Sequence, residues 1–276
     1  MIAELKTSHD LSTNRACALV CVSKTAHYYQ PKKKKADNAI KLYLQSLAAD
    51  HKRWGFDKMM LKIKAEAKSW NHKRVHRIYC ELGLNIRVKP RKRIPKGEAK
   101  ALVQPLLPNI CWSMDFVSDV LEDGRKFRAF NVIDDYNREA LMVEPSHSLP
   151  AAKVVRLLDV IVSKRGYPEM IRVDNGPEFI SGTFVKWAKE NGVALHHIQP
   201  GKPAQNGLVE RFNRTYREDI LDMNMFRHLQ EVRAITKDWL KMYNEDRPHE
   251  SLAGLAPMAF VTFRKDKMKL ENSILK

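Results

Sequence analysis

Cysteines and long apolar runs are both scarce in this chain. Only 4 of its 276 residues are cysteines, too few for the disulfide framework of a small secreted domain. A zinc site is the other conceivable use of these thiols, but the spacings match no common zinc pattern; its ligands would be Cys17, Cys21, His72, His76 and Cys80. The longest early apolar run, Ala16–Val22, is too short for a signal peptide or a bilayer span. The sequence therefore predicts a cytoplasmic protein.

Acidic residues are scarce in the first third of the chain. Residues 1–100 hold 24 lysines and arginines against 8 aspartates and glutamates, whereas residues 101–276 hold 25 against 24. The formal net charge of +17 is therefore concentrated in the first third. This asymmetry predicts a basic module that binds nucleic acid, joined to a nearly neutral globular domain. A basic surface that only confers solubility is the alternative.

The basic module divides into helices and linkers. Residues 1–36 contain a short helical pattern and end in a lysine-rich linker. Apolar periodicity predicts helices within residues 37–85. Residues 86–104 carry prolines among basic residues and are predicted to form a second, basic linker.

The last helix of residues 37–85 is the one predicted to meet DNA. Asn71 stands at its N-cap and Gly83 at its end. One face is apolar, and the other carries Lys73, Arg74 and Arg77. A helix, a short turn and a basic second helix predict a helix-turn-helix DNA-binding domain. A small helical bundle with a solvated basic face fits the same periodicity.

Residues 105–264 alternate between strands and helices and are predicted to form one catalytic domain, followed by a tail at 265–276. In residues 112–116 the apolar side chains fall on one strand face, and Ser113 and Asp115 fall on the other. Further strands are predicted near 127–133, 140–143, 170–173 and 193–198, with helices beginning near 150, 183 and 203. Short connections make an antiparallel meander, and helical crossovers add parallel strands.

Three acids in this domain are candidate metal ligands. Asp115 lies mid-strand, Asp174 ends the fourth strand, and Glu210 lies on the last helix after a gap of 35 residues. Two carboxylates ~4 Å apart repel by about 4 kcal/mol at an effective dielectric near 20, and divalent cations remove that cost. Oxygen ligands favour Mg²⁺ or Mn²⁺, and a pair of such ions can activate the attacking oxygen and stabilise the leaving one in phosphoryl transfer.

The last helix adds positive charge beside its acid. Glu210, Arg214 and Arg217 follow one another at i, i+4 and i+7 and share one helix face, which suits a metal site that also handles a phosphate. Asp134 and Asp135 compete with Asp115 for the first ligand position. Because aspartate is common in tight turns, a hairpin turn is the favoured interpretation of that pair.

Five longer segments are more specific than the acids alone: WSMDFVSD (112–119), VIDDYNRE (132–139), RVDNGPEF (172–179), QPGKPAQNGLVERFNRTYRED (199–219) and YNEDRPHESLAGLAP (243–257). In this order they resemble the catalytic subunit of bacterial insertion-sequence transposases, the OrfB-type proteins with a retroviral integrase-like aspartate-aspartate-glutamate core. Residues 53–84 also resemble the helix-turn-helix segment that precedes that core.

The resemblance implies a fold and an activity. The fold would be α/β: a ribonuclease H-like mixed five-stranded sheet flanked by helices, preceded by a small all-α helix-turn-helix domain. The activity would be that of a polynucleotidyl transferase that cuts DNA and joins it during transposition. Its catalytic and metal-binding residues would be Asp115, Asp174 and Glu210, holding two Mg²⁺ ions for which Mn²⁺ could substitute. The expected partners are DNA, an upstream OrfA-type protein and further copies of the chain on DNA, at the bacterial nucleoid.

Several single residues are expected to contact DNA. Arg217 falls where the family places a basic residue that holds the DNA end, and Arg247 with His249 in the closing segment is expected to meet phosphate. Gln205 and Asn206 either contact DNA or cap the last helix. Two alternative functions remain: a catalytically silent DNA-binding protein derived from a transposase, and a nuclease of the same fold that acts on RNA–DNA hybrids.

The residues after Asp174 are expected to shape its turn. Asn175 and Gly176 are predicted to shape this turn, with the glycine allowing a positive φ and a close approach of the backbone to the substrate. Plain turn chemistry is the alternative interpretation of the two residues. Glu178 is predicted to be an acid in the first turn of the following helix.

Overall fold

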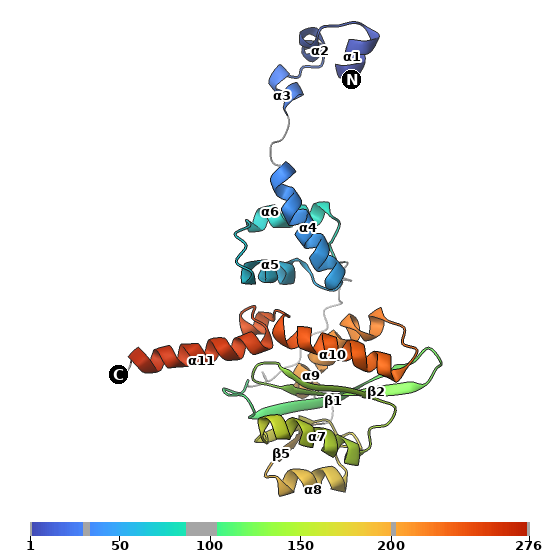
Figure 1. The fold of residues 1–276 in the computed structure, drawn as a ribbon, viewed down its shortest axis with the longest axis vertical. Coiled ribbons are helices and arrows are strands. Elements are labelled where there is room, and N and C mark those ends of the chain that lie inside the picture. Colours follow the sequence, from blue (N-terminus) through green and yellow to red (C-terminus); the bar gives the residue numbers. More distant parts are fainter. Residues whose placement is uncertain (1, 30–33, 87–103, 200–202, 275–276) are drawn as a thin grey trace. The chain divides into compact units, whose positions relative to one another are not determined.

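A computed structural model describes residues 2–29, 34–86, 104–199 and 203–274 (Figure 1). Most of the predicted basic linker, residues 87–103, lies outside the described residues. The chain forms two compact units, one of residues 1–50 with 70–85 and one of residues 51–69 with 86–276. None of the described helices is long and apolar enough to cross a membrane.

All elements described in the first unit are helices, and those within residues 37–85 agree with the apolar periodicity. Its helices are α1 (Ile2–Ser8), α2 (Thr13–Leu19), α3 (Lys24–Tyr28), α4 (Lys34–Asp50) and α6 (His72–Glu81). The side chain of Asn71 accepts hydrogen bonds from the backbone amides of Lys73 at 2.9 Å and Arg74 at 3.4 Å, so it caps α6 as expected. Asp37 of α4 pairs with Arg74 at 2.7 Å and with Arg77 at 2.8 Å, which ties α4 to α6.

The second unit contains a five-stranded mixed sheet. Its strands are β1 (Cys111–Val120), β2 (Lys126–Asp134), β3 (Ala140–Ser146), β4 (Met170–Val173) and β5 (Ala194–His197), in the order β3-β2-β1-β4-β5. The first three strands pair antiparallel, and β4 and β5 join in parallel. The predicted fold class is therefore confirmed. Short turns permit the meander, whereas the helical crossovers force parallel pairing.

Helices cover both faces of this sheet (Figure 1). The unit's helices are α5 (Phe56–Ala65), α7 (Ala151–Arg165), α8 (Gly182–Glu190), α9 (Gly207–Asp219), α10 (Leu229–Glu245) and α11 (Pro257–Ile274). Short 3-10 turns lie at Pro203–Asn206, Leu221–Met223 and Glu250–Leu252. Because α11 continues to Ile274, most of the predicted tail, residues 265–276, is helical.

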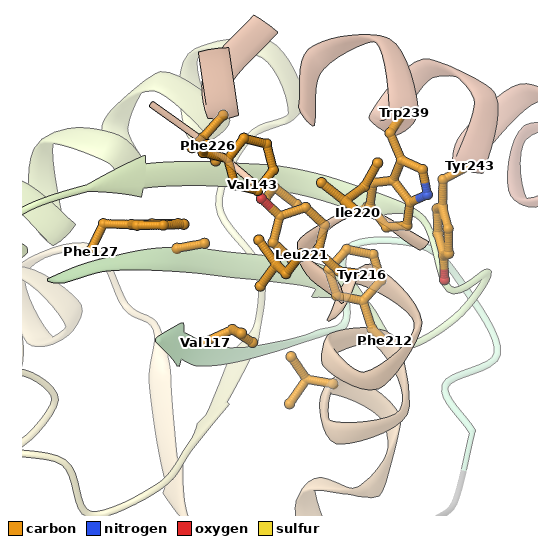
Figure 2. Packing of buried hydrophobic residues seen from close by; sticks show 14 of the residues in the cluster. Val117, Phe127, Val143, Phe212, Tyr216, Ile220, Leu221, Phe226, Trp239 and Tyr243 are labelled. Carbon is orange, nitrogen blue, oxygen red and sulfur yellow. The ribbon is translucent and has the colours of Figure 1, made fainter. Parts of the chain in front are cut away.

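Two hydrophobic clusters lie on opposite faces of the sheet. One joins β1–β3 to α9 and α10 through Phe212, Tyr216 and Trp239 (Figure 2). The other joins the sheet to α7 and α8 and contains Trp112 and Met114 of β1. Since successive strand residues point to opposite faces, Asp115 points to the α9 face, as the alternation predicts.

Candidate active site

Asp115 is held by two hydrogen bonds on the α9 side of the sheet. The backbone amide of Phe116 donates to its Oδ1 at 2.8 Å, and Asn213 Nδ2 of α9 donates to its Oδ2 at 2.7 Å. The Oδ1 of Asn213 in turn accepts from Asn131 Nδ2 of β2 at 2.7 Å. Both asparagines are buried. The chain of hydrogen bonds from β2 through α9 therefore fixes the orientation of the Asp115 carboxylate.

Asp174 directly follows β4 at the same level of the sheet. In the parallel pairing of β1 with β4, Ser113 lies beside Arg172, so the register two residues further on sets Asp174 level with Asp115. The backbone amide of Gly176 donates to Asp174 Oδ1 at 2.9 Å. Strand register and turn thus place this carboxylate beside that of Asp115.

The feature of Gly176 that matters here is the small space at its Cα rather than its backbone angle. It is not among the residues with positive φ, so the expected left-handed conformation is wrong. A Cβ at this position would instead lie 2.9 Å from Asp174 Oδ1.

Glu178 also differs from expectation, because α8 begins only at Gly182 and Glu178 pairs with Arg128 of β2.

Glu210 lies in the first turn of α9 and is exposed. Partial loss of hydration raises its pKa. It is three residues before Asn213, so the two side chains share a helix face. Because Asn213 contacts Asp115, this face of α9 is the one turned toward the strand acids.

Asp115 is affected by the charges of the other two acids. Burial is the main cause that raises the pKa of Asp115 to about 6, and the negative charges of Asp174 and Glu210 raise it further, against the Phe116 amide and Asn213. Among the described residues no ion pair offsets any of the three. Within those same residues, no three His, Cys, Asp or Glu side chains are grouped tightly enough to hold a metal ion as they stand.

The donor set nevertheless fits a hard divalent cation. All three side chains offer oxygen, the ligand atom that Mg²⁺ and Mn²⁺ prefer. In the part of the chain that the structure describes, no lysine or arginine pairs with these acids, and a cation would remove the repulsion that Asp174 and Glu210 exert on Asp115. The raised pKa of Asp115 is the sign of that repulsion on top of burial.

Asp134 and Asp135, the competing candidates for the first ligand position, are bonded to other groups of the protein. Residues 135–137 form the predicted turn. Asp135 is fully buried and pairs with Arg172 at 2.6 Å, while Ser113 Oγ donates to it at 2.6 Å. Asp134 accepts from the backbone amides of Asn109 at 2.8 Å and Tyr136 at 2.9 Å. Both carboxylates are therefore already satisfied by protein donors.

Two arginines follow Glu210 along α9, and both have partners within the protein. Arg214 pairs with Glu218 at 3.1 Å, one turn further along the helix. Arg217 donates to the backbone oxygen of Ser118 at 2.5 Å and lies 3.7 Å from Asp222. The Arg217 side chain is 40% exposed, so part of its guanidinium can still reach a phosphate.

The two residues before α9 are tied to the protein itself. Gln205 Oε1 accepts from the backbone amide of Gln199 at 2.9 Å. Asn206 occupies the N-cap position without a side-chain capping bond, and its Nδ2 lies 3.4 Å from the backbone oxygen of Met114. Its Oδ1 is buried with no partner among the described residues. Neither side chain caps α9 in the expected way.

The remaining predicted DNA contacts are distributed over both units. In the first unit Lys73 is exposed on α6, while Arg74 and Arg77 are engaged with Asp37. In the second unit Arg247 is buried and pairs with Asp219 at 2.5 Å.

Asn131 and Asn213 are the site residues that the sequence analysis missed. Each carried a readable signal. Asn131 interrupts the apolar run of β2, and Asn213 is spaced by three from Glu210 on a helix whose core stripe is otherwise apolar and aromatic. Buried amides of this kind need partners, and here they find each other and Asp115.

Three family models match the chain. Two are described as Integrase core domain and match residues 105–203 and 191–257. The third is described as HTH-like domain and matches residues 35–93. Together the matched ranges include all three acids and the helices α4, α5 and α6.

Similar proteins come from bacterial insertion elements. The "Insertion element IS476 uncharacterized 39.2 kDa protein" of Xanthomonas euvesicatoria is 38% identical over 91% of this chain and 72% of its own length. The "Insertion element IS407 uncharacterized 31.7 kDa protein" of Burkholderia multivorans is 36% identical over 94% of each chain. The "Putative transposase InsK for insertion sequence element IS150" of Escherichia coli is 26% identical over 75% of this chain and 77% of its own length.

Proposed function

This chain belongs to the insertion-sequence transposases of the OrfB type with an integrase core, and from that premise we propose the residues and metal of its reaction. As a transposase of this family it is a polynucleotidyl transferase that acts on DNA. The proposed reaction has two steps, cleavage at the element ends and transfer of the freed 3′-hydroxyl to target DNA. Neither step needs a serine or tyrosine nucleophile.

The proposed catalytic residues are Asp115, Asp174 and Glu210. One observation carries this assignment: the negative charges of Asp174 and Glu210 help to raise the pKa of the buried Asp115, and no ion pair among the described residues offsets these acids. They would hold two Mg²⁺ ions, with Mn²⁺ able to substitute. The chemistry that such ions supply when bound is activation of the attacking oxygen and stabilisation of the leaving oxygen of a phosphodiester.

The protein's own contribution is to position these groups. Asn213 and the Phe116 amide hold the Asp115 carboxylate in one orientation, and the Gly176 amide does the same for Asp174. Hydrogen bonds to the ionised form also favour the charged state that a cation requires. Glu210, exposed on the first turn of α9, supplies the third carboxylate from the open side.

Basic side chains would bind the DNA around this site. Arg214 and Arg217 are proposed to contact backbone phosphate next to the acids, because both lie on the exposed side of α9 within two turns of Glu210. Gln205 and Asn206 precede the same helix and are proposed to border the DNA. In the first unit, Lys73, Arg74 and Arg77 are proposed to contact DNA through α6. An upstream OrfA-type protein and further copies of the chain are the proposed protein partners.

Strand joining by matched variants tests the assignment. Labelled element ends are incubated with the full chain and Mg²⁺, with and without the upstream partner, and the Asp174→Asn variant is run in parallel. The wild type is expected to join strands, and the variant is expected to bind DNA without joining. Equal joining by both proteins would contradict the catalytic assignment. DNA binding without metal-dependent joining under any condition would favour a silent DNA-binding protein.

A further inference from the structure

A second charged site lies on another side of α9, away from the acids. It is a cavity of about 520 Å³ in the second unit, between α9, the end of β2 and the segment after α10. Its apolar wall is formed by Ile133, Phe212 and Tyr243. Its polar wall is basic and includes Lys58, Arg138, Arg211, Arg247 and His249. We call it the basic cavity.

Positive charge in the basic cavity is far from balanced. Four lysine and arginine side chains line it, against one acid, Glu250. Arg247 is neutralised by Asp219 at 2.5 Å, and Arg138 donates to the backbone oxygen of Asp135. Among the described residues neither Lys58 nor Arg211 has an ion pair. Two basic side chains are thus available to an incoming ligand.

The basic groups feel one another's charge. Burial, followed by the charge of Arg247, lowers the pKa of Lys58 to about 8. Burial also lowers the pKa of His249 to about 3, and the positive charges of Arg247, Lys58, Arg211 and Arg138 add to this effect. His249 is therefore neutral at physiological pH. Such mutual repulsion is relieved when an anion binds between the groups.

His249 adds an unused hydrogen-bonding atom. Its Nε2 is buried and has no partner among the described residues. Buried polar atoms usually have a partner, so an orphaned ring nitrogen in a basic cavity marks a position for a ligand atom. In the tautomer that carries the proton on Nε2, it would donate to an anionic oxygen.

The geometry of α9 separates the basic cavity from the acids. Leu208, Arg211 and Thr215 line the cavity and recur at i, i+3 and i+7. Glu210 and Asn213 lie on the acidic side. Adjacent helix residues differ by about 100° around the axis, so the side chains of Glu210 and Arg211 project from two different sides of α9.

We propose that the basic cavity binds a backbone phosphate of DNA, as a second anchor on the side of α9 away from the catalytic acids. Phosphate is the anion that suits the cavity, because Arg211 can bind two of its oxygens with paired N–H donors while Lys58 adds a second positive charge. The choice of DNA rests on the proposed function. A phosphate held by Arg211 would clamp the helix that carries Glu210, the neighbouring residue.

The salt dependence of DNA binding by the full chain tests this proposal. A short fluorescein-labelled duplex is titrated in EDTA at several chloride concentrations, and fluorescence anisotropy gives the binding constant. The slope of log K against log salt is negative, and each phosphate contact that is removed reduces its magnitude by about 0.9. The double variant Lys58→Gln with Arg211→Gln is expected to lose about two such contacts. The control for loss of one surface charge is Lys186→Gln on α8, because the side chain of Lys186 is 76% exposed.

Two further arms separate the possible results. Arg211→Lys keeps the charge and is expected to keep most of the slope. Pyrophosphate at constant ionic strength is expected to raise the Tm of the wild type and not that of the double variant. If the double variant changes the slope, per charge removed, by no more than Lys186→Gln does, the proposal is overturned. A pyrophosphate effect without any change of DNA slope would also overturn it, because the cavity would then take a small phosphate ligand.

Failure here is distinguishable from failure of the proposed function. The titration contains no divalent metal and needs no strand joining. An inactive wild type that shows the expected slope change would contradict the catalytic assignment alone. An active wild type without the slope change would contradict the basic cavity alone.

Discussion

Asn213 donates to Asp115 across 2.7 Å, from a helix to a strand that lies 98 residues earlier in the chain. Asn131 donates to Asn213 in turn at 2.7 Å, so three buried or half-buried side chains form a line from β2 to the candidate active site. Under the proposed function, Asn213 would act on the reaction through Asp115, as a positioning residue.

Replacing Asn213 by alanine is expected to shift the pH dependence of strand joining. The hydrogen bond from Asn213 lowers the pKa of Asp115, so its loss raises that pKa above about 6. The acidic limb of the activity profile then moves to higher pH. The unfolding free energy is expected to fall by about 1–3 kcal/mol, because the amide of Asn131 loses its acceptor.

The matched control is Asn191→Ala, which removes an asparagine side-chain bond to the backbone oxygen of Trp187 at 2.8 Å, on α8. This variant should leave the pH profile of joining unchanged. If Asn213→Ala lowers activity equally at all pH values, its role is structural only.

Asp115→Asn is expected to stabilise the protein while it abolishes joining. Folding raises the pKa of Asp115 from 3.8 to about 6, so the ionised carboxylate destabilises the fold above pH 6. At about 1.4 kcal/mol for each unit of pKa, reduced for partial exposure, the gain at pH 7.5 is about 1–3 kcal/mol. Since both proteins are neutral at this position below about pH 4, the difference in Tm should vanish there. Thermal melts in EDTA measure it.

The exposed Asp238→Asn on α10 is the control for removal of one negative charge. The difference in Tm between this variant and the wild type should change little between pH 4 and 7.5. A Tm of Asp115→Asn at or below that of the wild type throughout this range would show that ionised Asp115 is not destabilising.

Gly176→Ala is expected to impair the site with little effect on the fold. The added methyl group would lie 2.9 Å from Asp174 Oδ1 and would push this carboxylate aside. Displacement of a reacting group by about 1 Å can lower the rate about 100-fold. Joining kinetics, with circular dichroism as a check of folding, measure the effect.

Gly182→Ala offers a close comparison, because no heavy atom lies within 4 Å of its added Cβ and it begins α8. It should join strands at the wild-type rate. Similar losses in the two alanine variants would point to a general effect of glycine replacement rather than to the Asp174 carboxylate.

Breaking the pair of Asp135 with Arg172 is expected to destabilise the protein. The pair spans 2.6 Å, and both residues are buried. Removal of one partner leaves an unpaired charge inside the protein, at a cost of about 3–5 kcal/mol. Asp135→Asn and Arg172→Gln should each lower the midpoint of urea unfolding, and the double variant should lose less than their sum.

This cycle also tests whether Asp135 is a metal ligand. If it serves only the fold, the folded fraction of Asp135→Asn still joins strands. A variant that is fully folded and fully inactive would instead place Asp135 in the active site.

Local patterns account for most of the predicted fold. Alternation in residues 112–116 correctly indicated which face of β1 carries Asp115, because strand side chains alternate whatever the rest of the fold. The cap at Asn71 was also predictable, since a side-chain acceptor three residues before the amide it satisfies is a local feature. The same locality explains the error at Glu178. The prediction for Glu178 used only its position ahead of a helix, whereas in the structure it lies in the turn before α8 and pairs with Arg128 of β2.

The sequence by itself determined the strand and helix order, the faces of the elements and, through its resemblance to a family, the choice of three acids. These depend on neighbours a few residues apart and on recognisable segments. Only the tertiary structure decided that Asn213 holds Asp115, that Arg172 neutralises Asp135, and that Arg211 meets Arg247 in a basic cavity. Those partners are 36 to 98 residues apart. Their meeting follows from strand register and helix rotation, which no local pattern of side chains encodes.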